Sequence, residues 1–252
     1  MRYVALCLVF LGGLGCADSS PTAPTASPPP QTLAITAPVD WVLTGDAVTL
    51  SASATFGDGA VRTVLPRWSV DDASLATVDA NGRVLGRGAG VATIVATLEG
   101  VTASTRIRVI PDHRGVWAGT LRQTSCRHWD FRTCGRSYPS TSTFVLQLQL
   151  QQQKDNVRGM FDVALTYPAG ALNQGTVHTT GTAHGSTGVD GTLAMDGDIV
   201  LNDRLIGTMF RWRSRIEDGV WRGGFSLLYP GAPGDLFPLV LEYDIVGLTR
   251  SP

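Results

Sequence analysis

Short runs in which apolar and polar residues alternate are the feature that most constrains the fold of this chain. Val48–Ala54 and Phe144–Gln151 place apolar residues at one parity and mainly Ser, Thr or Gln at the other. This period of two gives a strand one dry and one wet face, and turn residues break the runs at regular intervals. No long apolar stripe of helical period occurs after residue 15. The sequence therefore predicts an all-β protein.

Residues 32–110 contain roughly seven such runs, which is typical of an immunoglobulin-like sandwich. Asn81-Gly82 lies between two apolar runs and is a strong hairpin signal. Gly57-Asp58-Gly59 marks a second turn, and Glu99-Gly100 separates the last two runs, 90–98 and 101–110. We expect the first domain to span residues 32–111.

Four motifs in this domain occur in a recognisable order: W-S-V-D-D at 68–72, A-T-V-D at 76–79, N-G-R-V at 81–84 and G-V-A-T-I-V-A-T at 90–97. Together they resemble the bacterial immunoglobulin-like group 2 domain. The resemblance implies a spacer or adhesion module at the bacterial cell surface, although a fold alone does not establish a function. The expected core residues are Trp68, Val78, Val84, Ile94, Leu50 and Val109.

The remaining residues, 112–252, predict a second β domain. Phe144–Gln151 and Val157–Leu165 flank a Lys154-Asp155-Asn156 turn, and further runs lie near 115–123, 174–184, 189–201, 204–217, 219–229 and 237–249. About eight antiparallel strands in sequence order can close into a small barrel. The opening Gly115-x-Trp117 is similar to lipocalin and avidin-like barrels. Only Asp112-His113-Arg114 separates the two domains, so we expect little interdomain motion.

The N-terminus predicts export. Val4–Leu14 is an apolar run that is too short for a transmembrane helix, which needs about 20 residues, and it fits a signal peptide over 1–15. The end of this run resembles a bacterial lipoprotein cleavage site, with Gly15 before Cys16, although Gly13 stands where that pattern usually has Leu. The resemblance implies that Cys16 is acylated and anchors the protein to a membrane. The alternative is an ordinary secretory signal cut nearby.

The stretch that follows has five prolines and no large apolar residue over Ala17–Gln31. Such a composition cannot bury enough surface to offset the entropy of ordering, and Pro28-Pro29-Pro30 favours a stiff, extended backbone. We expect residues 16–31 to form a lipidated cysteine and a tether that holds the folded domains away from the membrane.

Two cysteines remain in the exported domains, Cys126 and Cys134, and we predict that they form a disulfide. A metal site formed with His128 is the alternative, but the ligand spacing matches no common zinc site. The loop between the cysteines contains Arg127, Trp129, Phe131 and Arg132. Aromatic and arginine residues anchor many interfaces, so these four are candidate binding residues. Alternatively, the two aromatic rings cover the barrel mouth.

Charge and motifs argue against several function classes. The chain has 20 basic and 21 acidic residues, and neither domain has the excess or clustering of Lys and Arg that a phosphate backbone requires, so we expect no nucleic-acid partner. No G-x-S-x-G, H-E-x-x-H or G-x-x-x-x-G-K-[ST] motif occurs. His178 and His184 would lie about 20 Å apart on one strand, which is too far for one metal. We therefore predict no catalytic residues, no cofactor and no metal.

The sequence as a whole predicts a non-enzymatic cell-envelope lipoprotein whose immunoglobulin-like domain presents a barrel. Beyond the membrane, candidate partners are a surface glycan, a protein or a small apolar ligand. The alternative is a carrier that holds an apolar molecule in a hollow barrel, and a third hypothesis is a hydrolase in the barrel loops. An interior filled by Trp117, Phe144, Phe161, Trp212 and Phe225 would favour surface binding over the carrier.

Overall fold

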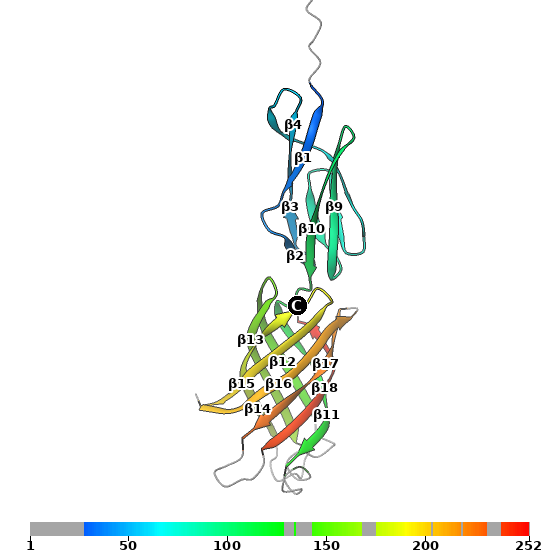
Figure 1. The fold of residues 1–252 in the computed structure, drawn as a ribbon. Coiled ribbons are helices and arrows are strands. Elements are labelled where there is room, and N and C mark those ends of the chain that lie inside the picture. The colour runs from blue at the N-terminus through cyan, green and yellow to red at the C-terminus, as the bar shows by residue number, and fades with distance from the viewer. Residues whose placement is uncertain are drawn as a thin grey trace, which may run out of the picture.

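The computed structural model describes residues 28–128, 134, 143–167, 175–202, 204–217, 219–230 and 238–251. Two β domains follow one another along the chain and lie end to end (Figure 1). The predicted all-β class is confirmed. Cys16, Trp129, Phe131 and Arg132, which the sequence singles out, lie outside the described residues.

The first domain is a sandwich of short strands. Three sheets have the orders β1-β4-β5, β2-β10-β9-β6 and β3-β8-β7, and β2 pairs with β10 in the parallel direction. The strands are β1 Pro30–Thr36, β2 Trp41–Leu43, β3 Ala47–Thr49, β4 Ser51–Phe56, β5 Val61–Val64, β6 Arg67–Val70, β7 Ala76–Val78, β8 Arg83–Gly86, β9 Gly90–Leu98 and β10 Val101–Ile110. β1 therefore begins two residues before the expected start of the domain.

Four of the six predicted core residues are buried: Leu50, Val84, Ile94 and Val109. Trp68 and Val78 pack against the same core but are only partly buried. The reason is their place in the sheets, because β6 and β7 are edge strands and leave one side of each residue open. Trp68 and Val78 therefore belong to the rim of the predicted core and not to its fully buried centre.

The predicted hairpin turns are present. Glu99 and Gly100 join β9 to β10 with φ angles of 48° and 88°, as a tight turn requires. Gly82 has a φ of 77°, and the Asp79 carboxylate accepts hydrogen bonds from the amides of Asn81 and Arg83, each at 2.9 Å. These local bonds fix the β7–β8 connection.

The second domain is a closed barrel of eight antiparallel strands, as predicted. Each strand pairs with the next, and β11 also pairs with β18. The strands are β11 Gly115–Arg127, β12 Thr143–Gln153, β13 Asn156–Tyr167, β14 Gly175–Thr187, β15 Thr192–Leu201, β16 Arg204–Glu217, β17 Val220–Tyr229 and β18 Leu239–Arg250. Closure removes free sheet edges, which would otherwise pair with other chains.

Side chains fill the barrel. A continuous column of aromatic rings occupies the interior, with centroid separations of 4.9 Å for Trp212–Phe225, 5.3 Å for Phe225–Tyr243 and 5.0 Å for Phe144–Tyr243. The five aromatic residues proposed as interior fillers are all buried: Trp117, Phe144, Phe161, Trp212 and Phe225. At the end away from the first domain, a cavity of only about 40 Å³ lies beside Thr179 and Tyr229. A small-molecule site usually measures several hundred Å³, so the described interior has no room for an apolar cargo.

Candidate functional site

The linker between the domains, Pro111–Arg114, is bonded to the folded parts on both sides, and we call this region the junction. In the first domain, Thr44 Oγ1 accepts a hydrogen bond from the Asp112 amide at 2.9 Å. In the barrel, Trp117 Nε1 donates to the His113 carbonyl at 3.0 Å, and Arg250 donates to the Asp112 carbonyl at 2.9 Å. The linker backbone is therefore held in place over its whole length.

Gln152, at the end of β12, joins the linker to the barrel through its side-chain amide. Its Oε1 accepts from the His113 amide at 2.8 Å, while its Nε2 donates to the carbonyls of Pro111 and Lys154 at 3.0 and 2.9 Å. Sequence reasoning missed this residue, although a signal was present. Gln152 has the same parity as the buried Leu148 and Leu150, so it interrupts the apolar face of its strand.

His113 is fully buried at the junction end of the barrel. Its Nε2 lies 3.0 Å from Thr187 Oγ1. When that hydroxyl donates to the Thr192 carbonyl at 3.2 Å, Nε2 carries the ring proton and donates to the hydroxyl. Its ring centroid lies 5.2 Å from that of Trp221. Burial lowers the pKa of His113 to about 4, which the charge of Asp112 only partly opposes. His113 is thus a neutral packing residue at neutral pH, and it is the second residue that the sequence did not single out.

Ion pairs surround the linker. The Asp112 carboxylate accepts from Arg114 Nε at 2.8 Å and lies 3.2 Å from Arg250, while Arg114 also reaches Asp46 of the first domain at 2.9 Å. Burial alone would raise the pKa of Asp112, but the hydrogen bonds from Arg114 and the charge of Arg250 outweigh it and lower that pKa. Partly exposed pairs add little stability individually, so their main effect is to fix the orientation of the two domains.

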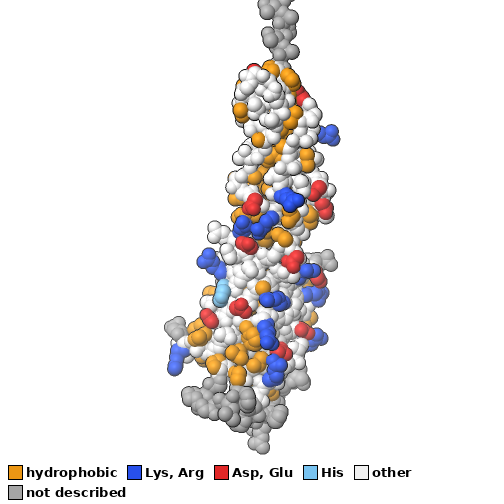
Figure 2. All heavy atoms as spheres, in the orientation of Figure 1, with side chains coloured by type: hydrophobic (Ala, Val, Ile, Leu, Met, Phe, Trp, Pro, Cys, Tyr) orange, Lys and Arg blue, Asp and Glu red, His pale blue; other side chains and the backbone are white. Residues whose placement is uncertain are grey.

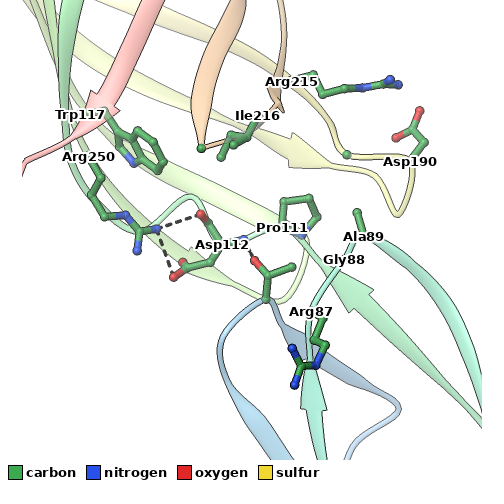
Figure 3. Close-up of a pocket in the computed structure, with 13 residues that line it drawn as sticks. Arg87, Gly88, Ala89, Pro111, Asp112, Trp117, Asp190, Arg215, Ile216 and Arg250 are labelled. Carbon is green, nitrogen blue, oxygen red and sulfur yellow. Dashed lines mark hydrogen bonds and ion pairs between the residues drawn. The ribbon is translucent and has the colours of Figure 1, made fainter. Parts of the chain in front are cut away.

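A pocket of about 350 Å³ opens beside this network, between the two domains (Figure 3). Arg87–Ala89 line it from the first domain. On the barrel side, the Arg250 guanidinium lies 4.9 Å above the Trp117 ring, and Asp190 and Arg215 lie across the pocket. Hydrogen bonds from Thr192, together with the charge of Arg215, lower the pKa of Asp190. This lining can bind charged and polar groups.

The outer wall of β11 to β14 carries a shallow groove. Two adjoining hollows of about 370 and 630 Å³ share Val116, Gln149 and Met160, and the side chains of Val116 and Met160 are 41% and 57% exposed. Beside the groove, His178 Nδ1 lies 2.9 Å from the Asp162 carboxylate. Outward glutamines of β12 provide uncharged polar groups along its wall.

At the far end of the barrel, the predicted disulfide joins Cys126 to Cys134. Arg127 lies against the barrel wall, where it pairs with Glu242 of β18 at 2.7 Å, and the other candidate binding residues of this loop fall outside the described positions. The strand bounds give long connections at this end, 128–142, 168–174 and 230–238, whereas the connections at the junction end are 154–155, 188–191 and 218–219.

Across the described positions, no group of three or more His, Cys, Asp or Glu side chains could hold a metal ion, which includes Cys126, His128 and Cys134. No helix among those positions is long and apolar enough to cross a bilayer.

Comparison with known proteins identifies the first domain. Residues 31–109 match the family model of the bacterial Ig-like domain (group 2), so the resemblance seen in the sequence is confirmed. The match covers the first domain only. No curated protein matches the chain. Among solved structures, domains 5–6 of the S-layer protein SbsC are 13% identical, with 85% of this chain and 97% of that chain covered and a TM-score of 0.30.

Proposed function

We propose that this chain is a non-enzymatic, lipid-anchored protein of the bacterial cell envelope. In this proposal the Ig-like domain acts as a spacer, and the barrel meets a partner through its surface. The group 2 Ig-like match over residues 31–109 supports the envelope location. The observation that carries the spacer role is the junction, because its linker is bonded to both domains and favours a stiff, end-to-end arrangement.

The position of the chain's entry supports the anchor. β1 begins at the end of the Ig-like domain that is farther from the barrel (Figure 1). A tether that precedes β1 would therefore hold the barrel on the side away from the membrane. The long connections of the barrel lie at its far end, and long loops on a rigid scaffold often carry recognition. Trp129, Phe131 and Arg132 belong to one of these connections by sequence.

The filled barrel supports surface recognition rather than internal transport. Carriage of an apolar molecule requires a cavity, and aromatic rings occupy the described interior from end to end. A surface glycan or another protein is then the partner that a barrel of this kind would bind.

Metabolic labelling of the full chain with a clickable fatty acid in a bacterial host tests the anchor. We expect label on the wild type, none on Cys16→Ser, and normal label on Cys7→Ser, because Cys7 leaves with the signal peptide. Equal labelling of Cys16→Ser and the wild type would show that the anchor assignment is wrong.

A further inference from the structure

Four arginines gather on the outer face of β16 and β17, and we call them the arginine cluster. Arg211, Arg213 and Arg215 alternate with the buried Trp212 and Ser214, so all three point outward. Arg222 of β17 lies directly opposite Arg215 in the strand register. All four side chains are exposed. Figure 2 shows basic side chains along the barrel on this side of the molecule.

Acidic side chains neutralise the arginine cluster only in part. Asp190 shares the pocket with Arg215, whose charge helps to lower the pKa of Asp190, but the two described side chains form no ion pair. Elsewhere on the barrel, Arg122 pairs with Asp244 and Arg127 with Glu242. Within the described part of the chain, no carboxylate lies within 4 Å of any guanidinium of the cluster. Like charges directly opposite each other, as at Arg215 and Arg222, destabilise a sheet. Stability of the barrel therefore does not explain this arrangement.

Backbone carbonyls orient the guanidinium groups instead. Arg213 Nη1 donates to the Trp212 carbonyl and Arg222 Nη1 donates to the Val246 carbonyl, both at 2.9 Å. Each of these contacts uses one of the five N–H donors of an arginine and leaves its charge uncompensated. The exposed side chains keep further N–H donors, in the fork geometry that suits a carboxylate.

A strained bulge adds to the cluster. The register between β16 and β17 shifts between Phe210 and Arg213, so Phe210 and Arg211 lie on the same outer face, with the Arg211 guanidinium 5.3 Å from the Phe210 ring centroid. Arg211 has a φ of 57°, in the left-handed region that glycine occupies at lower cost. A strained non-glycine residue on an exposed charged face indicates a use for its side chain.

The surroundings of the arginine cluster indicate the partner. Asp196 and Asp198 are exposed on the neighbouring strand, β15, and can accept hydrogen bonds from hydroxyl groups. Gly223 and Gly224 leave the backbone beside Arg213 free of side chains. Arg215 also lines the pocket between the domains, so the basic surface extends from the arginine cluster to Arg87. A ligand that covers this surface needs spaced negative charges and hydroxyl groups along one narrow chain.

We infer that the arginine cluster binds an acidic polysaccharide whose carboxylates pair with the guanidinium groups. A dense polyphosphate or an anionic bilayer fits less well, because its closely spaced negative charges would lie against the carboxylates of Asp196 and Asp198. The hydroxyl groups between the carboxylates of a polysaccharide can donate hydrogen bonds to them instead. This inference rests on the proposed function in one respect, since it names the class of envelope partner that the barrel would bind.

Calorimetric titration of the purified full chain with polygalacturonate, with neutral dextran as the blank polymer, tests the inference. We expect Arg213→Gln/Arg222→Gln to weaken binding at least tenfold, which corresponds to about 1.4 kcal/mol. The matched control is Arg83→Gln/Arg106→Gln, which removes the same charge from exposed, unpaired arginines of the Ig-like domain and should bind like the wild type. Equal binding by the wild type and the cluster variant would overturn the inference, as would equal weakening by the control.

Arg211→Gly separates binding from folding. Glycine relaxes the left-handed backbone, so the melting temperature should stay the same or rise while binding of polygalacturonate weakens. Unchanged binding would remove Arg211 from the site. Binding of polyphosphate or phosphatidylglycerol vesicles in place of polygalacturonate would show that the partner class is wrong. Fatty-acid labelling at Cys16 does not affect these results, so the inference and the anchor fail independently.

Discussion

At the scale of single residues, the junction depends on polar groups that lie where apolar ones are expected. His113 is buried against Trp221 and keeps one hydrogen bond, to Thr187. Its Nδ1 has no hydrogen-bond partner among the described residues. Burial without a second hydrogen-bond partner favours the neutral form of this imidazole. The folded protein therefore resists protonation of His113, and protonation favours opening of the junction end of the barrel.

The stability of the barrel should therefore fall in mild acid. The pKa of His113 is about 4 in the folded protein, below the ordinary value of 6.5, so the unfolded chain binds an additional proton between these two pH values. The free energy of unfolding is unaffected by this titration above about pH 6.5. It falls by a total of about 3 kcal/mol as the pH drops toward 4. Urea unfolding at pH 7, 5 and 4 measures it.

Two variants isolate this effect from the titration of carboxylates. His113→Phe keeps a ring in the same space and cannot be protonated, so its unfolding free energy should depend less on pH than that of the wild type. His184→Gln removes an exposed histidine and is the matched control for the loss of an imidazole. Parallel pH curves for the wild type and His113→Phe would contradict the prediction.

Residue-scale roles were only partly predictable from the sequence. The parity of Leu50, Val84 and Ile94 identified them as core residues because strand alternation alone decides which face they occupy. Trp68 was expected to be interior, but the pattern does not reveal that β6 is an edge strand. Gln152 and His113 could not be assigned, since their partners are 39 and 74 residues away and become neighbours only when the barrel closes.

At the scale of elements, the strands were predictable but their curvature was not. Alternation located all eight barrel strands, because each has one face on the filled interior. The bulge at Arg211 does not follow from alternation, and neither does the close approach of β13 to β12 and of β14 to β15. Glycine allows this approach: a Cβ on Gly159 would lie 1.9 Å from the Gln149 carbonyl oxygen, and one on Gly181 would lie 2.0 Å from that of Asp198.

Gly181→Ala should therefore destabilise the barrel more than an ordinary surface substitution. Its Cβ would also lie 2.6 Å from the Phe161 ring, so both a backbone and a core side chain must move. Overpacking of this kind costs about 1–3 kcal/mol. Thr182→Ala, at the next position and exposed, is the matched control and should change stability by less than about 0.5 kcal/mol. Similar denaturation midpoints for the two variants would contradict the prediction, because they would show that β14 and its neighbours accommodate the added Cβ without cost.

At the scale of the whole molecule, the junction decides whether the chain behaves as one body or two. The short linker predicted restricted motion, and the structure supplies the mechanism through hydrogen bonds between the linker and the side chains of Thr44, Gln152, Trp117 and Arg250. Ion pairs from Arg114 to Asp46 and from Lys154 to Asp40 cross between the domains at 2.9 and 3.7 Å. The ion pairs are partly exposed and weaken with salt, whereas the linker bonds do not depend on ionic strength.

Gln152→Ala should convert the molecule from one rigid body into two. The substitution removes the three hydrogen bonds of this side chain, two of which reach the linker, and leaves the His113 amide without its acceptor. We therefore expect a loss of about 2–3 kcal/mol in barrel stability. Relaxation of backbone amide ¹⁵N nuclei should give one common rotational diffusion tensor for both domains of the wild type, and separate, faster tumbling in the variant. Gln151→Ala, on the outer face of the same strand, should keep the common tensor.

High salt alone should have a smaller effect than Gln152→Ala, because it weakens only the ion pairs. Independent tumbling of the wild-type domains would contradict the spacer role, since a flexible joint cannot hold the barrel at a fixed distance from its anchor.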